Sequence, residues 1–137
     1  MRVLAVLVVA LATAGAASAA TSITFKTPTG NIGCVFNSGG GLGPSLRCDI
    51  RSGIRPKPPR PRVCSHDWGF SYSMAPTGTA RPLCVGDTVI RPTAKVLGYG
   101  KTWSRAGLTC TSRAAGLRCT NTSGHGFFLS RARSYRF

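Results

Sequence analysis

Six cysteines constrain how this chain of 137 residues can fold more strongly than any other feature of the sequence. In a small exported protein, an even number of cysteines is typical of a disulfide framework. A zinc site is the weaker alternative, because no two cysteines are spaced as C-x-x-C and export favours oxidation. We therefore predict three disulfides, with no metal site and no cofactor.

Two of the cysteine pairs lie in segments with the pattern of a β-hairpin, residues 31–50 and 107–121. The sequences LRCDIRSG at 46–53 and LRCTNTSG at 117–124 match at five of eight positions, which indicates a repeated hairpin; chance similarity is the alternative. Hairpin geometry favours pairing in chain order, although six cysteines allow many other connectivities. The predicted bridges, each worth about 3 kcal/mol, are Cys34–Cys48, Cys64–Cys84 and Cys110–Cys119.

The first twenty residues have the pattern of a signal peptide. A cation precedes an apolar run, and Ala17 and Ala19 form an A-x-A cleavage signal. The run is too short to span a bilayer comfortably, which takes about 20 apolar residues. We expect a signal peptide at 1–19, cleaved after Ala19 or Ala20. Residues 20–137 then form one soluble domain that is secreted or held at the cell envelope.

The sequence after this segment has the residue pattern of short β-strands separated by turns. Glycine and proline separate short runs in which apolar residues alternate with others, such as Ile23 and Phe25, or Phe70, Tyr72 and Met74. Helical spacing of apolar residues never persists over three turns. The sequence predicts a single all-β domain, a small disulfide-stapled sandwich or open barrel of about seven or eight short antiparallel strands.

Charge is the compositional feature that bears most directly on function. The chain has 18 Lys and Arg against 3 Asp and Glu, for a net charge of +15. This field attracts anionic polymers or an anionic membrane surface without specificity, and arginine suits bidentate contact with phosphate or carboxylate. A merely soluble basic protein is the alternative. The candidate anion-binding residues are Arg55, Lys57, Arg60, Arg62, Arg131 and Arg133.

Residues 55–62, RPKPPRPR, alternate prolines with cations. This composition predicts an extended polyproline II path. The segment is either a rigid cationic strip for an anionic surface or a Pro/Arg-rich crossover whose prolines keep a sheet edge from pairing. We favour the crossover.

The segments HDWG at 66–69 and GD at 86–87 have the composition of turns. Because the chain has so few acids, we expect each carboxylate to face an arginine. A metal site built from His66, Asp67 and Asp87 is a poor alternative, because nothing repeats at ligand spacing.

Several short motifs occur in a specific order along almost the whole of the chain after the signal peptide. They are FKTPTGNIGCVF, RCDI, CSHDWG, CVGDTV, LGYG, LTCTS, GLRCTN and GHGFFLSRARSYRF. With these motifs, the chain resembles an uncharacterised family of small secreted, cysteine-rich actinobacterial domains. The resemblance implies an exported or envelope-associated domain of unknown function, and it transfers no catalytic residue.

The sequence favours a non-catalytic role. It contains no G-x-S-x-G motif and no glutamate for a zinc-protease motif, and bridged cysteines do not act as nucleophiles. We predict a binding module for anionic envelope or extracellular polymers. Four aromatic residues are candidates for partial exposure at a binding surface, although a small β domain also needs aromatic residues in its core. They are Trp68, Tyr72, Tyr99 and Trp103.

Two other function classes stay open. The first is a small ribonuclease-like hydrolase in which His66 and His125 act as base and acid. His125 also fits a turn between strands, with Gly126 at positive φ and with Phe127 and Phe128 on opposite faces of the next strand. The second is a secreted inhibitor or toxin that acts through the glycine-rich loop 38–45.

Overall fold

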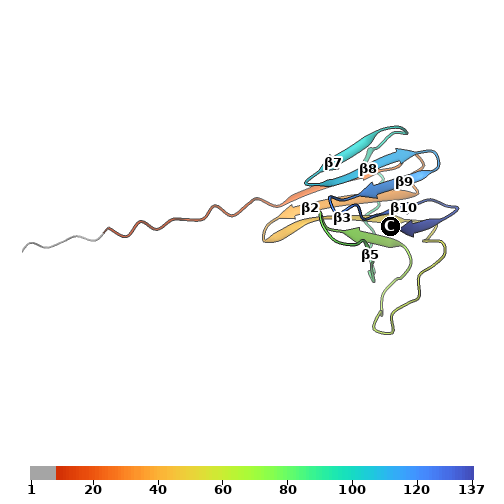
Figure 1. The fold of residues 1–137 in the computed structure, drawn as a ribbon, viewed down its shortest axis with the longest axis horizontal. Coiled ribbons are helices and arrows are strands. Elements are labelled where there is room, and N and C mark those ends of the chain that lie inside the picture. The colour runs from red at the N-terminus through yellow and green to blue at the C-terminus, as the bar shows by residue number, and fades with distance from the viewer. Residues whose placement is uncertain (1–8) are drawn as a thin grey trace, which may run out of the picture.

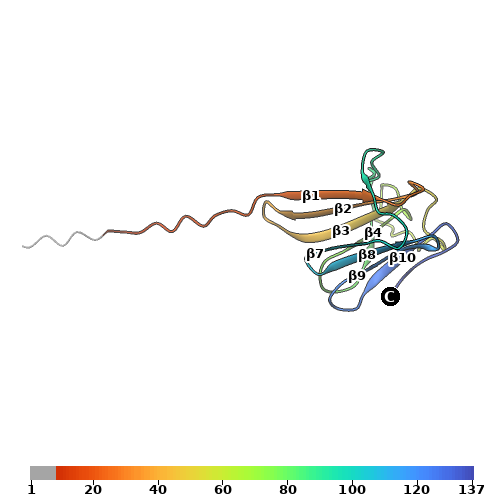
Figure 2. The same cartoon turned by 90° about the horizontal axis from the view of Figure 1, so that it is seen from above.

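The chain folds into two β-sheets that pack face to face (Figures 1 and 2). The computed structural model describes residues 9–137, and this part contains eleven strands and no helix. Neighbouring strands are antiparallel except β6, which pairs with β1 in parallel. Neither sheet closes on itself within these residues. The structure confirms the predicted all-β sandwich.

The first sheet has six strands and the second has five. In spatial order, the first sheet consists of β5 (Arg81–Pro82), β4 (Ser71–Met74), β3 (Leu42–Ile50), β2 (Ile32–Gly39), β1 (Thr21–Lys26) and β6 (Lys95–Val96). The second sheet consists of β11 (Ser134–Arg136), β10 (Gly126–Leu129), β9 (Gly116–Thr120), β8 (Leu108–Arg113) and β7 (Thr102–Arg105). There are more strands than predicted, because strands as short as β5 and β6 carry no alternating pattern.

Two disulfide-bridged hairpins, β2–β3 and β8–β9, form the centre of the sandwich. Cys34 lies directly opposite Cys48, and Cys110 lies directly opposite Cys119. Both pairs have a Cα–Cα distance of 4.1 Å, which suits the closely spaced pairs of an antiparallel ladder. All four cysteines are fully buried. The third disulfide, Cys64–Cys84, lies outside this centre, and the three bridges are the pairs that chain order predicts.

The repeated sequence that ends each hairpin forms the same turn twice. The amide of Gly53 donates to the carbonyl of Ile50 at 3.1 Å, and the amide of Gly124 donates to the carbonyl of Asn121 at 3.2 Å. Gly53 and Gly124 both adopt a positive φ, 82° and 75°, a conformation that glycine adopts without a steric penalty. The sequence match therefore corresponds to a structural repeat, with one copy in each sheet.

The segment before β1 extends away from the sandwich without regular structure (Figure 1). Near its end, the carbonyl of Ser18 accepts a hydrogen bond from the amide of Gly40 at 3.0 Å. The predicted cleavage site after Ala19 or Ala20 therefore adjoins the start of β1. The first part of the predicted signal peptide, residues 1–8, lies outside the described residues. No helix in the described part is long and apolar enough to cross a membrane.

Candidate anion-binding groove

A cationic groove crosses one end of the sandwich. The turn that follows β1 contributes to it, and this turn lies at the end of β1 away from the extended N-terminal segment (Figure 2). The groove has two adjoining parts of about 240 and 580 Å³, which share Thr29, Asn31 and Arg131. We call this feature the end groove. Its charged lining residues are Lys26, Arg51, Arg91, Arg113 and Arg131.

The acids of the chain line a different groove from most of these cations. No carboxylate lines the end groove. The three acids of the whole sequence, Asp49, Asp67 and Asp87, instead line a separate groove of about 350 Å³, which we call the acid groove. Arg51 borders both grooves. The charge of Arg91 also acts on Asp87, so the groove cations that lie apart from the acids are Lys26, Arg113 and Arg131.

Hydrogen bonds hold the floor of the end groove in one arrangement. The side-chain amide of Asn31 donates to the hydroxyl of Ser52 at 3.1 Å, and the amide of Ser52 donates back to Asn31 Oδ1 at 3.2 Å. Arg51 donates to the carbonyl of Gly30 through Nε at 3.2 Å. These bonds join the β1–β2 turn to the end of β3, so the site is ordered before a ligand arrives.

The cations of the end groove differ in how firmly they are held. Lys26 Nζ donates to the carbonyl of Pro92 at 2.5 Å, and Arg91 Nη1 donates to the carbonyl of Thr88 at 3.1 Å. Arg113 and Arg131 are exposed at the ends of the β8–β9 and β10–β11 turns. Neither guanidinium has a hydrogen bond or an ion pair within residues 9–137, so both are free to contact an anion.

The turn that carries Arg131 is itself fixed. The hydroxyl and the amide of Ser130 both donate to the carbonyl of Arg133, at 2.8 and 3.0 Å. The amide of Arg133 donates to the Ser130 hydroxyl at 3.1 Å. Arg133 lies outside the end groove, with its guanidinium 5.4 Å from the ring of Tyr135.

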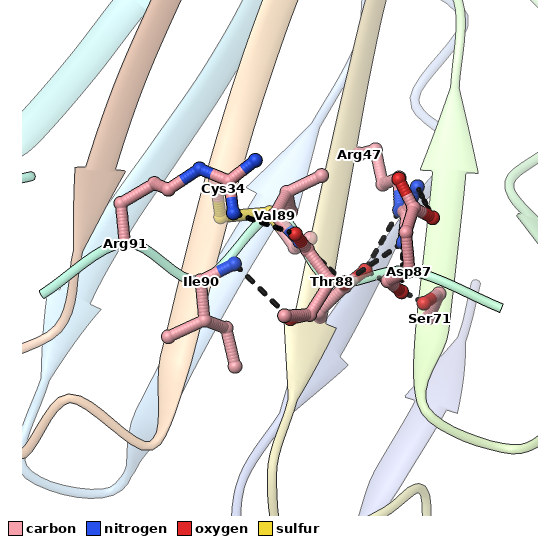
Figure 3. A network of polar contacts seen from close by, with 10 residues as sticks. Cys34, Arg47, Ser71, Asp87, Thr88, Val89, Ile90 and Arg91 are labelled. Atoms are coloured by element: carbon pink, nitrogen blue, oxygen red, sulfur yellow. Dashed lines mark hydrogen bonds and ion pairs between the residues drawn. A yellow bond between two sulfur atoms is a disulfide. The ribbon is translucent and has the colours of Figure 1, made fainter. Parts of the chain in front are cut away.

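The acid groove contains a closed ionic network, shown in part in Figure 3. Asp49 is only 4% exposed. It accepts hydrogen bonds from Arg47 Nε at 2.9 Å, from the Ser71 hydroxyl at 2.6 Å and from the amide of Val89 at 2.9 Å. Arg47 Nη1 also donates to Asp87 at 3.0 Å (Figure 3). Because the buried carboxylate has several donors, the network is structural.

Arg47 also acts on the exposed acid of this network, Asp87. The hydrogen bond from Arg47, followed by the charge of that guanidinium, lowers the pKa of Asp87 below its usual value. The expectation that every acid faces an arginine is only partly met, because Asp67 makes no ion pair within residues 9–137. The backbone carbonyl of Asp67 accepts a hydrogen bond from the amide of Val85 at 3.2 Å.

The structure does not gather the weak metal-site candidates into one ligand set. Asp67 and Asp87 line the acid groove, whereas His66 packs beside Gly86 and does not line it. Within the described residues, the one group of potential ligands close enough to share an ion consists of Cys48, Cys110 and Cys119, whose sulfurs are in disulfides.

The Pro/Arg-rich segment 55–62 forms part of a loop that projects from the sandwich (Figure 1, yellow-green). It connects β3 to β4, which pair with each other, so it is a long loop within one sheet. Arg60 donates to the carbonyls of Cys64 and His66, at 3.1 and 2.6 Å. Lys57 Nζ lies 5.7 Å from the centre of the Phe70 ring. Two cations of the segment therefore contact other residues of the same β3–β4 loop.

Only Arg131 among the six cations proposed from sequence lines the end groove. The other four charged lining residues, Lys26, Arg51, Arg91 and Arg113, were missed because each is an isolated cation in a different segment. No local sequence cluster marks them. Strand pairing brings them to one end of the molecule.

Three of the four aromatic candidates are wholly or partly buried. Trp68 and Tyr72 are buried. Trp103 is half-buried, and its ring centroid lies 5.1 Å from that of Phe25. Tyr99 differs, because it is 50% exposed and lines the smaller part of the end groove.

The two histidines lie in different surroundings. His66 is exposed next to the Cys64–Cys84 bridge, whereas His125 lies in the β9–β10 turn with Nδ1 at 3.3 Å from the carbonyl of Phe137. The end groove and the acid groove include neither of them. The geometry therefore offers no direct support for a paired acid and base.

The turn around His125 differs in one respect from the sequence-based prediction. Gly124, and not Gly126, adopts the positive φ. Gly126 is required for a different reason: a Cβ at this position would collide with the carbonyl of Cys119 on β9. Phe127 is fully buried and Phe128 is half-buried, as expected for neighbours on opposite faces of a strand.

The predicted loop 38–45 is mostly strand. β2 continues to Gly39 and β3 starts at Leu42, so the connection is a tight turn at 40–41. Leu42 is exposed at the tip. The predicted glycine-rich loop is therefore a tight turn at the tip of this hairpin.

Comparison with protein families assigns almost the whole chain to one family. A family model described as "Family of unknown function (DUF6636)" matches residues 5–137. The chain belongs to this family. The DUF6636 match includes both sheets, all three disulfides and every residue of the end groove. Its description names no activity and therefore assigns no functional residue. Neither the search of curated proteins nor the search of solved structures finds a match.

Proposed function

We propose that this DUF6636 domain is an exported, non-catalytic module that binds anionic polymers in its end groove. The observation that carries the proposal is the distribution of charge: five cations line a groove whose described lining has no carboxylate, while the three acids of the sequence line a second groove that shares only Arg51 among these cations. The alternative of a merely soluble basic protein does not account for a groove lined by cations and free of carboxylates. A groove of one sign focuses the field and raises the local concentration of anions.

Two further features support a binding role. The floor of the groove is cross-linked by the Asn31–Ser52 hydrogen bonds, which reduces the ordering needed on binding. Arg113 and Arg131 are exposed on short turns at its rim. Each of these two guanidiniums can make bidentate contacts with a phosphate or carboxylate.

Export completes the proposal. The signal-peptide pattern at 1–19 and the three disulfides fit an oxidising compartment outside the cytoplasm. There, the anionic partner is an envelope or extracellular polymer. Sequencing the N-terminus of the protein recovered from the culture medium or envelope tests this part, with cleavage after Ala19 or Ala20 expected.

Two double variants with equal net charge test the groove. Arg113→Ala/Arg131→Ala removes two groove cations, and Arg55→Ala/Arg62→Ala removes two cations from the projecting loop. Affinity for polygalacturonate, a polymer with one carboxylate per sugar, is measured from low to moderate salt. The groove variant should bind more weakly, with the slope of log K against log salt reduced by about two. The loop variant should bind like the wild type. Equal losses in both variants would show that only net charge matters.

A further inference from the structure

Tyr99 is held on a rigid turn beside the end groove. The amide of Lys101 donates to the carbonyl of Gly98 at 3.0 Å and closes the turn, with Gly100 at a φ of 78°. Two more bonds tie the turn to β8: Gly100 donates to the carbonyl of Ser112 at 2.7 Å, and Ser112 donates to the carbonyl of Lys101 at 3.0 Å. The position of the tyrosine backbone is therefore fixed.

Small neutral residues line the groove with Tyr99. This smaller part of the groove includes Ala114, Ala115 and Ala132, and among residues 9–137 Tyr99 is the only aromatic residue that lines the end groove. A tyrosine on a fixed turn offers a large contact area and loses little conformational entropy on binding. The smaller part of the groove therefore suits an uncharged ring.

Charged residues lie on the same part of the groove. Arg113 and Arg131 both line it together with Tyr99. A ligand that placed a ring on the tyrosine could bring anionic groups of the same chain to these guanidiniums. Such a ligand carries an anion on, or next to, each ring of its repeat.

We propose that the partner is an anionic glycan, whose sugar ring packs on Tyr99 while its carboxylate or phosphate groups pair with Arg113 and Arg131. The inference rests on the proposed function and specifies its ligand. The C–H face of a sugar ring is weakly positive and complements the negative face of an aromatic ring. The exposed hydroxyl of the lining residue Thr29 donates to no group in the described residues, so it suits a ligand rich in hydroxyl groups.

The residues favour a glycan over a single-stranded nucleic acid. Sites for single-stranded nucleic acids stack successive bases on several aromatic side chains. In the described part of the chain, the end groove has one aromatic side chain, Tyr99. One aromatic residue beside an exposed hydroxyl and two arginines instead fits one sugar ring and its neighbouring anions.

The test compares two polymers with the same anionic group. Polygalacturonate has a carboxylate on every sugar ring, and polyglutamate has carboxylates without rings. Tyr99→Ala should weaken binding of polygalacturonate by about tenfold and leave binding of polyglutamate unchanged. Tyr99→Phe, which retains the ring, should bind both polymers like the wild type. Arg113→Ala/Arg131→Ala should weaken both.

The outcomes separate this inference from the proposed function. If Tyr99→Ala binds polygalacturonate normally while the arginine variant still weakens it, the ring site is wrong and the anion groove stands. If Tyr99→Ala weakens binding of a single-stranded oligonucleotide but not of polygalacturonate, the ligand is a nucleic acid and the glycan is wrong. If the arginine variant binds both polymers like the wild type, the groove itself is wrong.

Discussion

Cys48 in the first sheet and Cys110 in the second lie with their Sγ atoms within 4.8 Å of each other. The two hairpin disulfides therefore lie close together in the interior of the sandwich, one in each sheet. Each closes one copy of the repeated hairpin, and both are fully buried. The peripheral bridge Cys64–Cys84 differs, because Cys84 is partly exposed.

This difference in burial predicts the order of reduction. Under native conditions, a mild reductant should open Cys64–Cys84 first, because a thiolate must reach the sulfur that it attacks. Alkylation followed by mass spectrometry should find label on these two cysteines while the circular dichroism of the β-sheets is unchanged. Equal labelling of Cys34 or Cys119 at the same stage would contradict the account.

Two buried serines predict opposite effects of the same substitution. The hydroxyl of Ser112 is buried without a hydrogen-bond partner in the described residues, whereas the hydroxyl of Ser71 donates to Asp49 at 2.6 Å. Ser112→Ala should raise the free energy of unfolding by about 1 kcal/mol, and Ser71→Ala should lower it by about 1–3 kcal/mol. Urea denaturation of both variants measures the changes. A loss of stability in Ser112→Ala would show that its hydroxyl has a partner in solution.

The buried carboxylate of Asp49 predicts a larger loss. Asp49→Asn removes the charge that Arg47 and Val89 contact, and it should lower the free energy of unfolding by about 2–3 kcal/mol. Asp67→Asn is the matched control, because Asp67 is exposed and makes no ion pair in the described part of the chain. Urea denaturation should find the control close to the wild type. Equal losses in the two variants would rule out a special role for the network.

The ion pair between Arg47 and Asp87 predicts a specific pH dependence. Because the folded-state pKa of Asp87 is lowered, its contribution to stability is present above the unfolded value, about 3.9, and is lost as the pH falls through the folded-state pKa. Carbon-detected NMR titration of the Asp87 carboxyl should find a midpoint below the usual value. In Arg47→Gln, the midpoint should move up toward that value. An unchanged midpoint in the variant would exclude Arg47 as the cause.

Local patterns in the sequence were enough to predict the fold class. The repeat of LRC-x-x-x-SG indicated two equivalent hairpins, because each copy contains the strand, the cysteine and the glycine of the turn within eight residues. The shortest strands gave no such signal. β5 and β6 each contain two residues and exist only because a neighbouring strand offers hydrogen-bond partners.

The site could not be predicted in the same way, because its residues are distant in sequence. The conspicuous run of cations at 55–62 is in a projecting loop, whereas Lys26, Arg51 and Arg113 come from three separate strand ends. The grouping of the three acids in one groove also has no signal in the local sequence. Only the pairing of β3 with β4, and the bridge between Asp67 and Val85, bring them to one groove.

Mapping the binding surface by NMR tests the central claim most directly. Isotope-labelled protein is titrated with short polygalacturonate oligomers, and the backbone amide signals are followed. The account predicts that the largest shift changes fall on the end groove, at Thr29, Asn31, Arg113 and Arg131. Changes concentrated at residues 55–62, or spread evenly over all exposed cations, would contradict a binding site in the end groove.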